Sequence, residues 1–546
     1  MEREKSTHPA VMTSIEDSPV PRKISPIDEI WTNAHSLKTA TTFLKDRSDS
    51  HTPLHLQNFV SGDFTPTVSS SAGSWIDSFN PKTGALFAKV PCTQPDDVEA
   101  AVQAAKAAFP AWAKTSRVER SQYLQRISDL IKLDREKFAV WESIDQGKTL
   151  ERARIEVDRA VANFSYFATY ILHEQTAARM IDGVALTYEH RSPAGVFALI
   201  SPWNMPLYLL TWKLAPCLAF GCTAVAKPSE ITSMSAFLLG RVFQEAGLPR
   251  GVINIIFGDG PTTGAALVAS PLVNGVSFTG GTETGIAIRQ ATAAQIGKHL
   301  SLELGGKNPT LVFSDSMLPE HRDRTIRIAA SAAFENQGEI CLCGSRIYVE
   351  KTMYDDFVRH FTDYVAKTYV LGQTVGAVAS LQHYNKIRGY LQLAAKDGAT
   401  FNLGGVPAAL LPPDDDDITV ISNSEERGYW IPPTTLTNVP LDSLVLKDEI
   451  FGPVVTISSF QDEQEAVSLA NDSEYGLAAV LLTADGARMR RVGEQLEAGM
   501  VWVNSWLVRE LGTPFGGMKN SGTGREGGDS SRDVFTVVRT MHLPSF

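Results

Sequence analysis

Five short apolar segments in the middle of the chain constrain its fold more than any other feature. They are rich in Val, Ile and Phe, they lack the alternation of a strand with one face in solvent, and helix-like stretches lie between most of them. Such segments are typical of a parallel β-sheet that helices cover on both faces, so we predict an α/β fold. The five segments are Val196–Ile200, Thr223–Ala226, Val252–Phe257, Val276–Phe278 and Thr310–Phe313.

Functional side chains are expected just after these segments, because ligands of open α/β sheets bind beyond the carboxyl ends of the strands. After the first segment, two prolines bracket a stiff turn that carries Trp203 and Asn204. After the second, Lys227 and Glu230 supply an ammonium and a carboxylate, which suit the hydroxyls of a ribose. Taken singly, such turns and charged pairs are usually structural.

A glycine-rich junction follows the fourth segment. Gly280 and Gly281 precede a helix-like stretch, and the absence of side chains there lets backbone N–H groups approach a phosphate. Most junctions of this kind are also only structural. Three polar or glycine-rich strand ends in succession, however, indicate a nucleotide-binding crevice.

Two later segments carry groups suited to covalent chemistry. Glu303 lies among leucines and glycines, where desolvation would raise the pKa of its carboxyl toward that of a useful base. Cys341 lies on a glycine-containing turn, and an activated cysteine is a common nucleophile for carbonyl carbon. The alternatives are a solvated carboxylate and a small buried thiol. We predict no metal site, because no second Cys or His pair lies at a ligand spacing from Cys341 and Cys343.

The composition excludes several classes of protein. Fifty Lys and Arg against 61 Asp and Glu give a formal net charge of −11, which argues against a nucleic-acid partner. No apolar run approaches the roughly 20 residues that cross a bilayer, so we predict no membrane partner. Five cysteines in 546 residues are too few for a disulfide framework and indicate a reducing compartment, so we predict a cytoplasmic protein.

Residues 1–54 differ in composition from the rest of the chain. They are rich in Ser, Thr, Pro and mixed charge, and they fit neither a secretory signal nor a transit peptide. We predict a flexible N-terminal extension. In the alternative, Ile30, Trp31, Phe43 and Leu44 dock a short helix onto the body.

Six motifs occur together in the chain: Pro202–Pro206, Lys227–Glu230, Phe278–Gly280, Leu302–Lys307, the loop ending at Cys341, and Glu449–Pro453. They have the order seen in the aldehyde dehydrogenase superfamily, so the chain resembles that superfamily from about residue 56 onward. The resemblance implies a Rossmann-like NAD-binding domain, an α/β catalytic domain and a small β domain for oligomerisation. By position they would hold residues 55–172 and 194–305, residues 306–525, and residues 173–193 and 526–546, respectively.

The resemblance implies NAD-dependent oxidation of an aldehyde to a carboxylate, through a thiohemiacetal and a thioester on Cys341. The Asn204 amide and the Cys341 backbone N–H would form the oxyanion hole, and Glu303 would activate water. A carboxylate at Glu230 would repel a ribose phosphate, so NAD is favoured over NADP. Gly281 departs from the usual serine of the family. The residues implied to bind the cofactor are Trp203, Lys227, Glu230, Gly280, Gly281, Glu449 and Phe451.

Two arginines indicate the substrate. Residues 504–518 and the cysteine loop resemble the branch of 2-aminomuconate 6-semialdehyde and 2-hydroxymuconate semialdehyde dehydrogenases, in which two arginines are implied to bind the carboxylate end of the substrate. They correspond to Arg159 and Arg509, although either could instead form a structural salt bridge. The leading hypothesis is an acidic semialdehyde such as 2-aminomuconate 6-semialdehyde, in the kynurenine or a related pathway. The alternatives are a broad-specificity aldehyde dehydrogenase and an inactive structural or binding protein of the same fold.

Self-association is expected from two segments. A strand near Val184–His190 and a C-terminal strand near Val534–Val538 would leave open edges unless they pair with another subunit. We therefore predict a homodimer or homotetramer whose other partner is the small aldehyde substrate.

Overall fold

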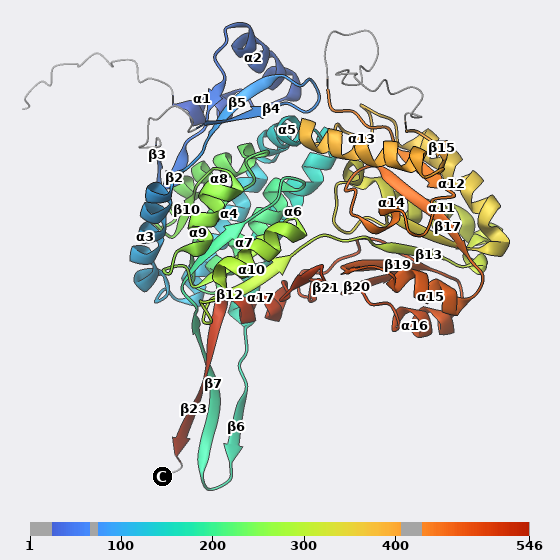
Figure 1. Cartoon of the computed structure of the whole chain (residues 1–546). Helices are drawn as coiled ribbons and strands as arrows, with labels where there is room; N and C mark the ends of the chain where they lie inside the picture. Colours follow the sequence, from blue (N-terminus) through green and yellow to red (C-terminus); the bar gives the residue numbers. More distant parts are fainter. Residues whose placement is uncertain (1–24, 66–74, 406–427, 545–546) are drawn as a thin grey trace, which may run out of the picture.

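The computed structural model describes residues 25–65, 75–405 and 428–544. Over these residues, two large sheets form the cores of two lobes, and a third sheet extends from the body as an arm (Figure 1). Helices flank both large sheets, which confirms the predicted α/β class. None of the helices in the described ranges is long and apolar enough to cross a membrane.

The first lobe is built on an eight-stranded sheet whose five consecutive strands β12, β11, β8, β9 and β10 are parallel. Alternate residues of β8 face opposite ways: Val196 and Ala198 pack in a cluster with α3, whereas Phe197 and Leu199 pack in a cluster with α7. Both faces are therefore buried, which explains the continuous apolar sequence. In spatial order the strands are β22 (Gly522–Thr523), β12 (His299–Glu303), β11 (Gly275–Thr279), β8 (Val196–Ile200), β9 (Thr223–Lys227), β10 (Ile253–Ile255), β2 (Asn58–Val60) and β3 (Asp63–Thr65).

The second lobe is built on a seven-stranded sheet. It contains β13 (Pro309–Val312), so the expectation that the fifth apolar segment joins the same sheet as the other four is wrong. The chain crosses between the lobes right after β12, and a continuous apolar run does not specify which sheet it enters. In spatial order the strands are β15 (Thr400–Leu403), β16 (Thr434–Thr437), β17 (Val454–Phe460), β14 (Arg346–Glu350), β13, β19 (Ala478–Leu482) and β20 (Met500–Val503).

The arm consists of β6 (Ala178–Ile181), β7 (Ala185–Pro193) and β23 (Thr536–Pro544). β7 pairs with both of the other strands, so the predicted open edge at Val184–His190 is wrong, and the open edges belong to β6 and β23. The C-terminal strand starts only at Thr536, because α17 (Gly528–Phe535) occupies the residues before it.

The N-terminal segment is helical from Pro26, so the prediction of a flexible extension is wrong for its described part. α1 (Pro26–Thr32) and α2 (Leu37–Asp49) begin at serine N-caps and bury Ile30, Trp31 and Leu44, as the docking alternative required. Residues 1–24 lie outside the described ranges.

The remaining elements fall into two groups by lobe. β1 (Leu54–His55), β5 (Leu86–Pro91) and β4 (Trp75–Phe79) form a small sheet beside α1 and α2, and β18 (Tyr475–Gly476) pairs with β21 (Met518–Lys519) (Figure 1). The first lobe has α3 (Pro95–Trp112), α4 (Arg117–Leu133), α5 (Arg135–Gln146), α6 (Leu150–His173), α7 (Pro206–Ala219), α8 (Met234–Glu245), α9 (Ala265–Ala269) and α10 (Thr282–Thr292). The second lobe has α11 (Pro319–Phe334), α12 (Tyr354–Thr368), α13 (Leu381–Lys396), α14 (Leu444–Lys447), α15 (Glu463–Asn471) and α16 (Gly486–Gly493).

Candidate active site

A cavity of about 420 Å³ is lined by residues of both lobes. The first lobe contributes the loops after β8, β11 and β12, and the second lobe contributes the turn after α11, the start of α13 and the loop after α14. Seven of the residues singled out in the sequence meet there. They are Trp203, Asn204, Gly280, Gly281, Cys341, Glu449 and Phe451.

Cys341 follows a turn with an unusual backbone. Asn336, Gln337 and Gly338 have φ values of 52°, 48° and 73°, and a Cβ on Gly338 would lie 2.2 Å from the carbonyl oxygen of Gly452. Only glycine fits at that position. Within the described residues the Cys341 backbone N–H donates to no other group, so it is free to bind an oxyanion.

The surroundings of Cys341 disfavour its thiolate form. Burial raises the pKa of the thiol, and the carboxylates of Glu449 and Glu303 raise it further, while Arg509 acts in the opposite direction. The activation that a cysteine nucleophile requires must therefore accompany ligand binding or come from a base.

Asn204 is held beside the cysteine turn. Its side-chain Nδ2 donates to the carbonyl oxygen of Glu339 at 2.8 Å, which leaves one N–H of the amide for a ligand in the cavity. The backbone carbonyl oxygen of Asn204 accepts from the Asn336 side chain at 3.2 Å and from the ammonium of Lys148 at 3.0 Å. The position of the amide is thus fixed from both sides.

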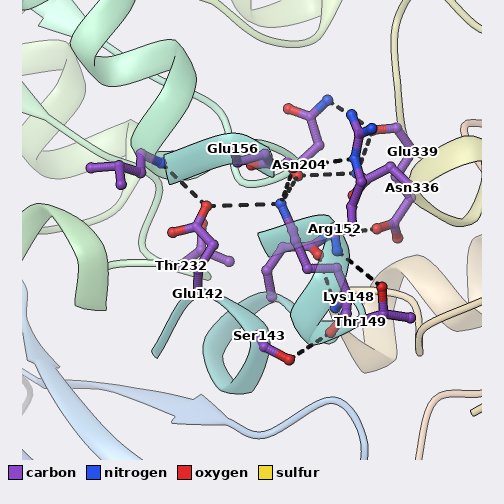
Figure 2. Close-up of polar contacts among 12 residues, drawn as sticks. Glu142, Ser143, Lys148, Thr149, Arg152, Glu156, Asn204, Thr232, Asn336 and Glu339 are labelled. Atoms are coloured by element: carbon purple, nitrogen blue, oxygen red, sulfur yellow. Dashed lines mark hydrogen bonds and ion pairs between the residues drawn. The ribbon is translucent and has the colours of Figure 1, made fainter. Parts of the chain in front are cut away.

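A buried charge network lies behind Asn204 (Figure 2). The Lys148 ammonium is 2.6 Å from Glu156 and 3.8 Å from Glu142, and none of the three side chains is exposed. Burial raises the pKa of Glu142 to about 7. No role was predicted for these three residues from the sequence.

Glu303 ends β12 and is 3% exposed. Burial raises the pKa of its carboxyl well above the ordinary value, and Glu526 adds to the shift; Lys213, Arg525 and Arg509 oppose it. The burial of Glu303 agrees with the desolvated carboxyl expected from the sequence, and its role as a base stays a prediction. Neither carboxyl oxygen has a hydrogen-bond partner in the described part of the chain. Lys213 and Glu526 form a buried ion pair at 2.8 Å, which was also not predicted from the sequence.

The cavity has the features of a dinucleotide site. Gly281 is the N-cap of α10 and a Cβ there would meet nothing within 4 Å, so the helix N-terminus is open to a phosphate. Glu449 accepts from the Gly306 N–H at 2.8 Å, and its backbone oxygen accepts from Lys386 at 2.9 Å. The ring of Phe451 lies 5.2 Å from that of Trp203.

Lys227 and Glu230 do not line this cavity. Glu230 lines a neighbouring cavity of about 620 Å³, which shares Ile231, Ser380 and Gln382 with the first. The Lys227 ammonium lies 3.6 Å from the Glu230 carboxylate, and burial lowers the pKa of the lysine. The structure thus does not bring these two residues to the cavity that holds the other predicted cofactor residues, and their role toward a ribose stays a prediction.

Arg159 and Arg509 come together around the ring of Tyr208, outside the cavity lining. Their Cζ atoms lie 5.3 and 5.9 Å from the ring centroid. Neither arginine forms a salt bridge with any residue in the described ranges. Arg509 is nevertheless close enough to Cys341 and Glu303 to shift the pKa of both.

A parallel sheet of the nucleotide-binding type lies beside a cysteine and a buried carboxylate. This combination indicates a dehydrogenase, and similarity to known proteins shows the family. The model of the aldehyde dehydrogenase family matches residues 67–541, and the chain belongs to this family. The resemblance inferred from the motifs is thereby confirmed.

Relatives and solved structures extend the similarity over most of the chain. The 2-aminomuconic semialdehyde dehydrogenase of Bos taurus is 45% identical over 497 residues, which are 89% of this chain and 98% of that protein. The 2-hydroxymuconic semialdehyde dehydrogenase of Pseudomonas sp. (strain CF600) is 41% identical, over 89% and 99% of the two chains. HpcC from Thermus thermophilus superimposes with a TM-score of 0.85 at 36% identity, over 92% and 96%. Betaine aldehyde dehydrogenase from Staphylococcus aureus, solved in complex with NAD+, gives 0.82 at 33% identity, over 89% and 94%.

Proposed function

We propose that this protein oxidises an acidic semialdehyde to a dicarboxylate with NAD as the cofactor. The observation that carries the proposal is the guanidinium of Arg509. Its Nη2 atom is buried and has no hydrogen-bond partner within the described residues, although Arg509 lies near Cys341 and Glu303. A buried guanidinium N–H without an acceptor is costly, and a substrate carboxylate would satisfy it. The relatives named for muconic semialdehydes support the same substrate class.

The reaction starts at Cys341. Its sulfur adds to the aldehyde carbon while the thiol proton passes to water, and the resulting oxyanion binds the free N–H of Asn204 and the Cys341 backbone N–H. NAD, when bound, supplies a hydride acceptor, and a thioester remains on the sulfur. Glu303 then takes a proton from water, the hydroxide attacks the thioester carbon, and the carbon–sulfur bond breaks to give the carboxylate.

The cofactor would be held by groups at the strand ends. Glu449 with Phe451 would hold the nicotinamide end, and Glu230 with Lys227 the adenosine ribose. The open N-terminus of α10 at Gly281 would receive the pyrophosphate. The carboxylate of Glu230 disfavours the additional phosphate of NADP.

Steady-state kinetics would test the substrate. NADH formation is measured with a muconate-type semialdehyde and with a neutral aldehyde of similar length, for the wild type, Arg509→Ala, and the exposed control Arg250→Ala. We expect kcat/KM of the wild type to favour the acid. Arg509→Ala should lower that preference by about 10²-fold, because charge-assisted hydrogen bonds are lost, and Arg250→Ala should not. Equal rates of the wild type on both aldehydes would contradict the proposal.

The assembly and the location are also proposals. The open edges of β6 and β23, with Met180 and Val538 exposed, support a homodimer or homotetramer that pairs these edges between subunits. A monomeric mass in light scattering would contradict this assembly.

The five free cysteines support a cytoplasmic location. The three domains keep the boundaries given above, with β22 as a strand that the catalytic segment adds to the first sheet.

A further inference from the structure

Tyr208 contacts both arginines attributed to the substrate carboxylate. We propose that Tyr208 is a positioning residue that determines specificity: it holds Arg159 and Arg509 so that both face the carboxylate end of the substrate. The inference rests on the proposed function, because it assumes that the two arginines bind the substrate. It adds a residue with no charge and no reactive group to the determinants of the site.

The three side chains come from three separate elements. Arg159 lies on α6, Tyr208 on α7, and Arg509 in the loop after β20. Arg509 donates a hydrogen bond from Nη1 to the Tyr208 hydroxyl, and the Arg159 guanidinium lies 5.3 Å from the centroid of the same ring. The Tyr208 hydroxyl thus fixes the guanidinium of Arg509, while the Tyr208 ring attracts the guanidinium of Arg159.

The cage around Arg509 leaves one end of its guanidinium available. Its Cζ atom is 4.3 Å from the ring centroid of Trp212 and 4.1 Å from that of Phe515, so the plane cannot swing freely. With Nη1 bound to Tyr208, the buried Nη2 is the end that lacks a partner in the described chain. Without the Tyr208 hydroxyl, the two rings would still limit the tilt of the guanidinium plane but not rotation within that plane, so Nη2 would no longer be held toward the substrate.

Tyr208 itself is buried, and its backbone is held by hydrogen bonds. It is 3% exposed, and its carbonyl oxygen accepts from Asn163 at 3.1 Å and from the Thr211 hydroxyl at 3.0 Å. It also lies only four residues after Asn204, which belongs to the oxyanion hole. One short segment therefore sets the separation between the reacting carbon and the carboxylate, which would select substrates by length as well as by charge.

The experiment is Tyr208→Phe, which removes only the hydroxyl. The control is Tyr123→Phe, because Tyr123 lies on α4 and has a different arginine, Arg126, at 5.9 Å from its ring. KM and kcat are measured separately for a muconate-type semialdehyde and a neutral aldehyde of the same length, with NAD saturating.

We expect Tyr208→Phe to raise KM for the acidic aldehyde by about tenfold, the effect of one hydrogen bond to a charged group, with kcat, KM for the neutral aldehyde and KM for NAD unchanged. Tyr208→Leu, which also removes the ring, should raise KM for the acidic aldehyde further, because Arg159 then loses its contact with the ring. If the wild type prefers the acid and Tyr208→Phe keeps that preference, the inference fails while the proposed function stands. An equal loss on both aldehydes would assign Tyr208 a purely structural role and overturn the inference. If the wild type has no preference, the proposed function fails.

Discussion

Replacing Lys148 with Met removes the cation at the centre of the buried network behind Asn204 (Figure 2). Glu156 and Glu142 would stay buried, with Arg152 as the nearest remaining cation, 3.8 Å from Glu156. Breaking a fully buried ion pair by removal of one partner costs about 3–5 kcal/mol. We therefore expect Lys148→Met to lower the free energy of unfolding by that amount.

The chain offers a matched control. Lys89 and Asp77 are also 2.6 Å apart, the same separation as Lys148 and Glu156, but their side chains are 31% and 44% exposed. An exposed pair contributes about 0–1 kcal/mol, so Lys89→Met should change the free energy of unfolding little. The distance is equal in the two pairs, but one pair is buried and the other is exposed.

Urea unfolding followed by tryptophan fluorescence measures both variants against the wild type, since the chain has nine tryptophans. In the folded Lys148→Met protein, kcat should also fall, because the Asn204 carbonyl loses its 3.0 Å bond to the ammonium. Equal losses of stability in the two variants, or a loss below about 1 kcal/mol for Lys148→Met, would refute the reasoning.

Two further predictions concern single side chains of the buried interior. Asn204→Ala removes the amide donor of the oxyanion hole, so kcat in the NADH assay should fall by about 10²–10³ with little change in KM; a loss under tenfold would remove Asn204 from that role. Asp145 has its pKa raised by burial to about 8, so its folded-state pKa exceeds its unfolded-state pKa, and its contribution to stability is largest at low pH and declines as pH rises toward 8. Asp145→Asn cannot titrate, so thermal unfolding should show the variant gaining stability relative to the wild type from pH 5 to pH 8, whereas a constant difference would contradict the assignment.

The sequence predicted those parts of the fold that local pattern determines. β8 has a continuous apolar sequence, and β9 has an apolar centre, because both faces of these strands are buried. That pattern is visible without a structure. β12 was missed because its sequence, His299–Glu303, mixes polar and apolar residues and its first two residues are only half-buried. The membership of β13 in the second sheet depends on pairing with β14 and β19, which lie far away in sequence.

The helical N-terminus illustrates the same limit. Ile30 and Trp31 gave only a weak apolar signal among charged and polar residues. In the structure, Trp31 lies between the cations of Lys137 and Arg241, at 4.8 and 4.7 Å from its ring. Both of these partners lie far away in the sequence, so composition alone favoured a flexible segment.

Some residues of the candidate site could be predicted from the sequence, and others could not. Residues at strand ends, such as Asn204 and Gly280, could be located because the fold class places ligands there. Buried ions such as Lys213 and Glu526 could not, since a charged residue in a sequence is usually solvated and only its distant partner, 2.8 Å away in space, makes burial possible. A weak signal existed at Glu156, which directly precedes Val157 on the buried face of α6.

The contrast between two arginines of α6 explains how a chain of net charge −11 can recognise an anion. Arg154 is paired with Glu136 at 2.7 Å, so its charge is already neutralised. Arg159, on the same helix, contacts the ring of Tyr208 and no carboxylate within the described residues. An aromatic ring attracts a guanidinium without neutralising its charge, so the arginine keeps its hydrogen-bond donors for a substrate. The acidic surface matters little at this position, because charges more than about 8 Å apart are screened at physiological ionic strength. Recognition of a carboxylate therefore depends on which partners the arginines have, and the net charge of the chain does not report that.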